Sequence, residues 1–211
     1  MKSFFLLGLV FFGLGRLGAQ SLMHQLPVRL NHGTVISQND VENYKVWGDF
    51  LSESYPQEPY MPIQTIYVKD SVSNANHGWD KISYAYLEDV VNDKVHDYYG
   101  RHLKDSLWLT LFDAYDGIGK RANYKLGNLF GTMPFRLKVI GNRKIKRFAK
   151  LPGFDKRLYT FSDCVFDPAH SRCMFYYTSY MGKLSASGYI VFMEKKEDKW
   201  LISYMITMWM S

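Results

Sequence analysis

The chain contains only two cysteines, Cys164 and Cys173, among its 211 residues. This scarcity excludes a fold held together by a dense disulfide framework. Beyond the N-terminal segment, no apolar run approaches the roughly 20 residues that a membrane-spanning helix needs. We find no internal repeat, no Gly-rich phosphate loop, no serine nucleophile elbow and no zinc-protease motif. No motif of the sequence therefore assigns an activity.

The composition is that of an ordinary globular protein in all but one respect. Hydrophobic residues make up 47% of the chain and charged residues 22%, which disfavours wholesale disorder. The length predicts one domain, or one domain with a small appendage. The exception is the 17% share of aromatic residues, which includes 16 tyrosines.

The N-terminus has the pattern of a secretory signal peptide. A short basic start, Met1 to Ser3, precedes the apolar run from Phe4 to Gly15 and a segment of small residues that ends at Ala19. We predict cleavage after Ala19 and export to the periplasm or the cell exterior. An uncleaved anchor is the alternative, although the run is short for a spanning helix. Residues 20–36 then form a lead-in, and residues 37–211 a single domain.

Hydrophobic spacing predicts helices first and strands later. Helices are expected over residues 38–54, 80–99 and 103–115, with a strand at 63–69 and a loop at 71–79. The period then changes to that of an antiparallel meander of about four strands joined by short turns. These strands are expected at residues 160–167, 172–181, 187–195 and 200–210. Helices packed on such a sheet define an α+β domain.

The last predicted strand alternates between two faces. Trp200, Ile202, Tyr204, Ile206, Met208 and Met210 share one face, which we expect to be buried under the helices. The opposite face includes Trp209 and is mixed, so it is half-exposed or lines a concavity. We name Tyr176 and Trp209 as a candidate aromatic binding face.

The C-terminal third resembles a family of uncharacterised exported bacterial proteins that is common in the Bacteroidetes. The resemblance covers roughly residues 150–211. It rests on Phe161–Asp167 (FSDCVFD), Met174–Tyr177 (MFYY), Gly182–Gly188, the Lys199-Trp200 turn and the terminal Trp209-Met210-Ser211. Family members end in a strand that finishes Trp-x-Ser after a Gly-Lys-Trp turn. The resemblance implies an exported α+β protein and implies no activity.

The sequence departs from this family pattern in one turn. Many members have two cysteines in a Gly-x-Leu-x-Gly-x-Gly turn, where this chain has Met181 and Ser185. Ala186 replaces a glycine of the pattern, and Asp198 stands before Lys199-Trp200. The order of helices and then a curved sheet is also loosely similar to cystatin-like and nuclear-transport-factor-like folds, a likeness of fold alone.

The two cysteines flank a predicted turn, and the strand register decides whether they are bridged. A two-residue turn at Pro168-Ala169 would place Cys164 directly opposite Cys173, within reach of a disulfide after local adjustment. A four-residue loop, 168–171, would make them diagonal neighbours about 7–8 Å apart, too far for a bridge. A disulfide and two buried thiols both remain open.

Charge segregation is the clearest functional signal. Between residues 120 and 157 there are 12 Lys and Arg residues and a single acid, Asp155. The densest cluster comprises Arg143, Lys144, Lys146 and Arg147. Such a segment attracts polyanions, and in an exported protein these are an anionic glycan, a lipid headgroup or an acidic protein surface. Nucleic acid is disfavoured by compartment. Alternatively, the acidic predicted helices (Glu88, Asp89, Asp93, Asp97 and Asp105) neutralise the segment internally.

We favour a non-catalytic binding module for an anionic partner or glycan. One alternative is a structural or assembly component of the cell envelope. Another is an enzyme whose pocket combines His96 or His170 with a carboxylate. On a helix, the six-residue spacing of His96 and His102 places them on different faces, so we expect no metal site and no cofactor.

Overall fold

The computed structural model describes residues 28–29, 35–36, 38–56, 60, 62–73, 84–92, 94–97, 99–116, 125–127, 130–148, 157–182 and 185–211. The predicted signal peptide lies outside the described residues, as do most of the lead-in and most of the predicted loop at 71–79. Two short strands of the lead-in, β1 (Val28–Arg29) and β2 (Val35–Ile36), pair antiparallel within a unit that comprises residues 1–39. The second unit, residues 40–211, contains the sheet and its helices.

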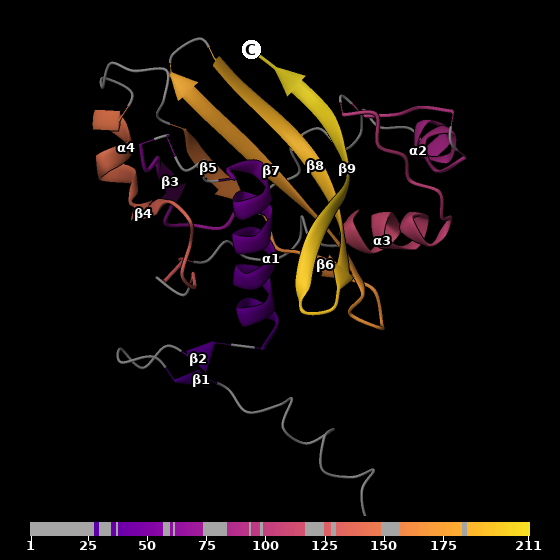
Figure 1. Cartoon of the computed structure of the whole chain (residues 1–211), viewed down its shortest axis with the longest axis horizontal. Coiled ribbons are helices and arrows are strands. Elements are labelled where there is room, and N and C mark those ends of the chain that lie inside the picture. The colour runs from indigo at the N-terminus through magenta and orange to yellow at the C-terminus, as the bar shows by residue number, and fades with distance from the viewer. Residues whose placement is uncertain are drawn as a thin grey trace, which may run out of the picture. The chain divides into compact units, whose positions relative to one another are not determined.

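A seven-stranded, mostly antiparallel sheet dominates the second unit (Figure 1). Its order is β4-β3-β5-β7-β8-β9, and the short β6 pairs with β7. The strands are β3 (Thr65–Lys69), β4 (Arg136–Ile140), β5 (Leu158–Phe161), β6 (Val165–Phe166), β7 (Arg172–Gly182), β8 (Ser185–Lys196) and β9 (Lys199–Met210). β3 pairs in parallel with both β4 and β5, and the remaining pairs are antiparallel.

The α+β class is therefore confirmed, but the strand number is not. The sheet has seven strands and not four, because β3 and β4 extend the meander at one edge and its first predicted strand is divided in two. The predicted strand at 160–167 is two strands, β5 and β6, separated by a buried polar turn. In that turn the Ser162 hydroxyl accepts hydrogen bonds from Tyr115 and from the backbone N–H of Tyr176. β4 was not predicted, because the segment around it was interpreted by its charge, although exposed Arg136 and Lys138 alternate with less exposed apolar residues as in a strand.

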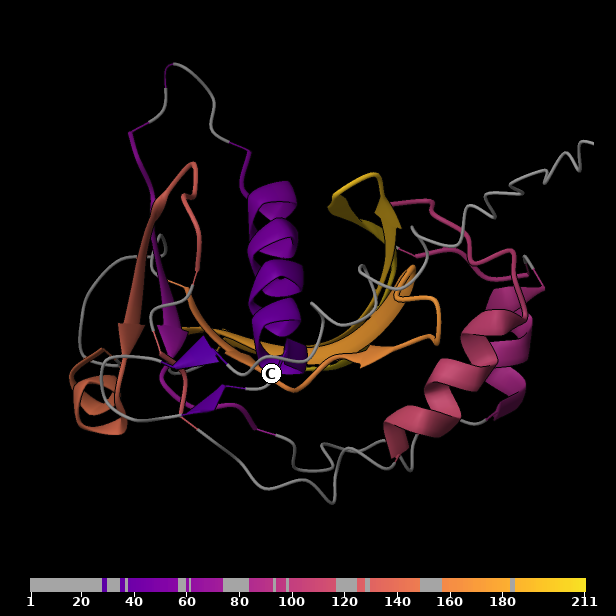
Figure 2. The same ribbon diagram turned by 90° about the horizontal axis from the view of Figure 1, so that it is seen from below.

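The helices lie on both faces of the curved sheet. α1 (Gln38–Ser54) has the predicted bounds and lies inside the curve of the sheet (Figure 2). α2 (Tyr84–Val91) and α3 (Leu107–Asp116) lie outside it, while α4 (Asn142–Phe148) follows β4. No helix of the described residues is long and apolar enough to span a membrane.

Two buried clusters correspond to these two faces. On the inner face, Trp47 and Phe50 of α1 pack against Phe161 and Phe175 of the sheet. On the outer face, Trp108 of α3 packs edge-to-face on Phe192. All the named rings of the two clusters are at most 2% exposed. Burial of aromatic side chains is a dominant stabilising contribution in such cores, which accounts for much of the chain's aromatic content.

The predicted helix at 80–99 ends early because Asp97 organises a loop. One carboxylate oxygen of Asp97 accepts the N–H groups of Tyr99 and Arg101, at 2.9 and 2.8 Å. Its other oxygen accepts the Arg101 side chain at 2.8 Å. Gly100 follows with a φ of 72°, a left-handed value that suits glycine. Local side-chain hydrogen bonds of this kind compete with the helix.

The single alternating pattern expected for β9 was wrong. Pairing with β8 shifts register between Phe192 and Met193 and again between Gly188 and Tyr189. Each shift inserts one extra residue in β9, and a bulge of this kind reverses the face that later residues occupy. Trp200, Ile202 and Met205 therefore contact the inner cluster, whereas Tyr204, Ile206 and Met208 contact the outer one.

The free edge of β9 is covered by carboxylates. The backbone N–H of Trp200 donates to Asp49 at 2.9 Å, and that of Ile202 donates to Glu53 at 2.8 Å. After the first bulge the N–H of Met205 donates to Asp97 at 3.3 Å. Asp49 and Glu53 are four residues apart on α1, which corresponds to a rise of about 6 Å. Trp200 and Ile202 are two residues apart on β9, which corresponds to about 6.6 Å. This match lets two consecutive turns of α1 bind alternate groups of the edge strand.

We expect Asp49→Ala and Glu53→Ala each to lower the free energy of unfolding by about 1.5–3 kcal/mol, because each leaves a backbone donor without its charged acceptor. Asp89→Ala is the matched control, since it removes an acid that pairs with Lys94 at the surface. It should leave the denaturation midpoint nearly unchanged. Chemical denaturation of the three variants checks this, and equal midpoints for all three would contradict the role of the edge carboxylates.

A second prediction concerns Gly188, where β8 passes close to two aromatic side chains. A Cβ atom at this position would overlap the Tyr176 hydroxyl and the Trp209 indole. Gly188→Ala should cost about 1–3 kcal/mol of stability. In a Trp209→Ala background the same change should cost less, and a double-mutant cycle measures the difference. If the destabilisations caused by Gly188→Ala and Trp209→Ala were additive, the contact between Gly188 and the Trp209 indole would not constrain β8.

Candidate functional site

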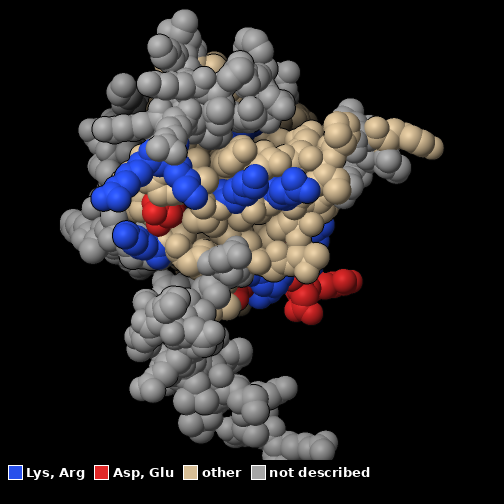
Figure 3. All heavy atoms as spheres, turned by 90° about the vertical axis from the view of Figure 1, so that its left-hand side faces the viewer, with Lys and Arg blue, Asp and Glu red and all other residues tan. Residues whose placement is uncertain are grey.

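Four basic residues of the segment 120–157 lie near one edge of the sheet. Arg136 and Lys138 are exposed on the edge strand β4, and Arg143 and Lys144 are exposed on α4. We call these four residues the basic face. Figure 3 shows Lys and Arg side chains in a row on this side of the molecule, with few acids among them. α4 includes the predicted Lys146 and Arg147, but their side chains lie outside the described residues.

Three of the five acids expected to neutralise this segment have other partners, and a fourth, Asp93, lies outside the described residues. Asp97 pairs with Arg101 at 2.8 Å, Asp105 with Arg172 at 2.6 Å and Asp89 with Lys94 at 2.8 Å. Among the described residues, no ion pair involves any member of the basic face. The charge of this face is therefore not balanced internally by the part of the chain that the structure describes.

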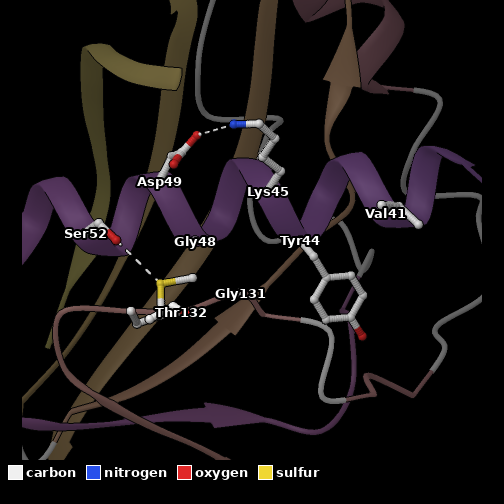
Figure 4. Close-up of a pocket in the computed structure, with 9 residues that line it drawn as sticks. Val41, Tyr44, Lys45, Gly48, Asp49, Ser52, Gly131 and Thr132 are labelled. Carbon is white, nitrogen blue, oxygen red and sulfur yellow. Dashed lines mark hydrogen bonds and ion pairs between the residues drawn. The ribbon is translucent and has the colours of Figure 1, made fainter. Parts of the chain in front are cut away.

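A groove of about 310 Å³ runs between α1 and residues 131–133 (Figure 4). Most of its polar side chains are already paired within the protein. Lys45 pairs with Asp49 at 3.1 Å, and the Ser52 hydroxyl lies 3.5 Å from the sulfur of Met133. A Cβ on Gly48 would overlap the methyl group of Met133. The groove is thus mainly a packing seam between α1 and residues 131–133, and both of its charged side chains are paired with each other.

A larger cavity, of about 420 Å³, lies on the inner face of the sheet. We call it the tyrosine cavity. Its floor is built from two cross-strand rows, which the register of β5, β7, β8 and β9 fixes. One row is Tyr159, Ser179, Ser187 and Met210, and the other continues from Tyr177 to Tyr189 and Thr207.

The hollow follows from the sizes of these side chains. Ser179 and Ser187 are directly opposite each other, and two small residues leave space beside the larger rings. Tyr177 and Tyr189 form the adjacent pair, stacked with ring centroids 5.0 Å apart. Tyr99, from the loop that Asp97 organises, contributes to the wall. The cavity therefore has aromatic walls and a polar centre.

Arg157 supplies the cation of the tyrosine cavity. Its guanidinium carbon lies 5.6 Å from the ring centroid of Tyr55, and it donates hydrogen bonds to the hydroxyls of Tyr55 and Tyr159. Those two hydroxyls also bind each other. The acid of the lining, Asp97, is already held by Arg101 and by backbone N–H groups. Arg157 is thus the charge of this lining available to a ligand.

Burial shifts the titration of the tyrosines in this region. Burial, followed by the neighbouring Tyr55, raises the pKa of Tyr159 far above its ordinary value. Burial likewise raises the pKa of Tyr177 well above the ordinary value. Both phenols therefore remain protonated at neutral pH and act as neutral hydrogen-bonding groups.

The other sequence candidates lie elsewhere. Tyr176 is 2% exposed within the outer cluster, and the Trp209 indole donates to its hydroxyl at 2.7 Å. His170 lies in the turn between β6 and β7 and stacks on Phe166. His96 and His102 approach to 5.7 Å between ring centroids, because the segment between them is not a helix as expected. The described residues contain no group of three or more potential metal ligands.

The two cysteines occupy the longer-loop register. Phe166 is opposite Cys173, and the N–H of Asp167 donates to the carbonyl of Arg172, so the loop comprises residues 168–171. Both cysteines are buried thiols in this structure. Burial raises the pKa of Cys164 well above its ordinary value, and a hydrogen bond with Cys173 adds to this. Thiols of this kind are unreactive at neutral pH.

No protein-family model, curated protein or solved structure matches this chain. The resemblance to exported bacterial proteins therefore stays a prediction. The tyrosine cavity could not be located from single residues, since it depends on register and on the sizes of opposed side chains. The sequence signal for the cavity was a tyrosine and a serine two residues apart, and hence on one face, in each of two neighbouring strands: Tyr177 and Ser179 in β7, Ser187 and Tyr189 in β8.

The buried tyrosines predict loss of stability in alkali. An unfolded tyrosine ionises near pH 10, whereas Tyr159 and Tyr177 stay protonated in the folded state to higher pH. The free energy of unfolding should therefore hold below pH about 10 and fall above it, by up to about 1.4 kcal/mol per pH unit for each such group. Denaturation at a series of pH values checks this. Tyr177→Phe should reduce the slope, and an unchanged slope would contradict the prediction for this residue.

Proposed function

We propose that this protein is a non-catalytic binding protein for an anionic glycan, which it contacts through the basic face. The observation that carries the proposal is the set of four exposed cations on consecutive elements, β4 and α4, without ion-pair partners in the described part of the chain. Unneutralised charge of one sign attracts polyanions and accelerates their association.

The geometry favours a linear polymer. Arg136 and Lys138 are two residues apart on an extended strand, so their side chains leave the same face about 6.6 Å apart. Arg143 and Lys144 continue the charge onto the helix that follows. A row of this kind suits the regularly spaced carboxylates or sulfates of an anionic polysaccharide. Export, predicted from the N-terminal segment, would bring the protein into contact with such polymers.

Charged residues on an edge strand also have a structural role, because they prevent edge-to-edge pairing. That role requires only that the edge be charged. Protection of the edge does not require that all four charges be positive, or that two of them lie on the helix that follows the edge strand. The enzyme alternative has less support, because no histidine lines either described cavity and the carboxylates that do are held by protein groups.

The test compares two charge-matched variants of the full chain. The basic-face variant has Arg136, Lys138, Arg143 and Lys144 changed to Gln. The control has Lys94, Lys104, Lys196 and Lys199 changed to Gln, which removes the same charge from elsewhere. The measurement is the affinity for a heparin oligosaccharide and for polygalacturonate over a range of salt concentrations.

We expect the basic-face variant to bind at least tenfold more weakly at low salt and to show a shallower dependence on salt. Each lost phosphate contact lowers that slope by about 0.7–0.9 for nucleic acids, and a similar release of counterions is expected here. The control should bind as the native chain does. An equal loss of affinity in both variants would show that binding depends on the net charge of the protein and not on the basic face, and would contradict the proposal. Retained binding in the basic-face variant would overturn the proposal. Binding to anionic vesicles but to neither polymer would do the same.

A further inference from the structure

We propose that the tyrosine cavity is a binding site for one acidic sugar ring, a pyranose that carries a carboxylate. This site is separate from the basic face and shares none of its residues, so the inference does not depend on the proposed function. It rests on three features of the lining: hydroxyls without partners, paired aromatic rings and one available cation.

The first feature is a set of hydroxyls that open into the cavity and have no partner within the described part of the chain. Ser179 is 5% exposed, Tyr177 6% and Ser187 9%, and all three line the cavity. Within the described part of the chain, none of their hydroxyls has a hydrogen-bond partner. A ligand with several hydroxyl groups of its own would satisfy them as both donor and acceptor.

The second feature is the aromatic surface beside these hydroxyls. Tyr177 and Tyr189 stack with an interplanar angle of 21°, and Tyr99 and Tyr159 also line the cavity. Aromatic rings offer a flat apolar surface with a polar tip. A pyranose has the complementary shape, with C–H groups on its faces and hydroxyls around its rim. A simple aromatic acid would fill the apolar part but leave the two serine hydroxyls unpaired.

The third feature is the charge of Arg157. The guanidinium is planar and binds carboxylates through two parallel hydrogen bonds. Asp97 cannot compete for it, because its oxygens already accept four hydrogen bonds from Arg101, from its own loop and from β9. A ligand with a single negative charge would neutralise the cavity, whereas a neutral sugar would leave Arg157 without a counter-ion.

The size of the cavity agrees with this ligand. Its volume of about 420 Å³ lies at the lower end of small-molecule sites, which are roughly 300–1,000 Å³. One sugar ring fits, with space for a linkage to a second. A ligand of this size binds an open site weakly, so a dissociation constant on the order of 1 mM is expected for the single ring.

The experiment titrates the full chain with three probes and follows the backbone amide signals of β8 and β9 by NMR. The probes are methyl glucuronide, its neutral twin methyl glucoside, and benzoate. We expect methyl glucuronide to shift signals around Ser187 and Tyr189 and to bind at least tenfold more tightly than either other probe. High salt should weaken this binding only slightly, in contrast to binding at the basic face.

Three variants separate the contributions. Tyr177→Phe removes one hydroxyl without changing the ring and should weaken the glucuronide about tenfold. Arg157→Gln should abolish the preference for the glucuronide over the glucoside. Tyr67→Phe is the control, since Tyr67 lies on the opposite face of the sheet, and it should bind as the native chain does.

The results that would overturn the inference are equally specific. Tighter binding of benzoate than of the glucuronide would assign the cavity to aromatic acids instead. No shift with any probe, in a chain whose amide spectrum is that of a folded protein, would remove the site. Unchanged binding in both Tyr177→Phe and Arg157→Gln would place the ligand elsewhere. None of these outcomes affects the polymer binding expected at the basic face.

Discussion

Three carboxylates on the free edge of β9 hold the architecture together. Asp49 and Glu53 attach α1 to the first half of the strand, and Asp97 attaches the loop after α2 to the second half. Because hydrogen bonds to charged groups are stronger than neutral ones, this edge is held more firmly than an open one. The inner face of the sheet, and with it the tyrosine cavity, depends on this attachment.

The sequence was a good guide where a single period governs a long segment. The bounds of α1 agree with its hydrophobic spacing, and the three long strands β7, β8 and β9 lie close to their predicted ranges. It was a poor guide where a polar side chain overrides the period. Asp97 ends the helical pattern through its own hydrogen bonds, and Ser162 interrupts the strand that was expected to continue through it. β4 was missed because residues 120–157 were interpreted by their charge and not by their alternation.

The candidate sites were predictable to different extents. Charge segregation is visible in the sequence, and the structure adds that three of the five expected acidic partners are paired elsewhere. The aromatic surface required knowledge of strand register. Tyr176 and Tyr177 are neighbours in the chain, yet one is buried beneath the outer helices and the other lines the cavity. An error of one residue in the assumed register moves every side chain of a strand to the opposite face of the sheet.

The two bulges of β9 divide the strand into three segments, and the inward-facing and outward-facing positions change places at each bulge. If one residue were inserted or deleted before the first bulge, a change at that bulge could restore the register, and the residues after it would keep their faces. The same change between the bulges would exchange Tyr204 and Met205 between the outer and the inner cluster. In related chains, gaps within this strand should therefore concentrate at Ser203 and Met208. An alignment that forbids gaps inside strands would pair residues from opposite faces of the sheet.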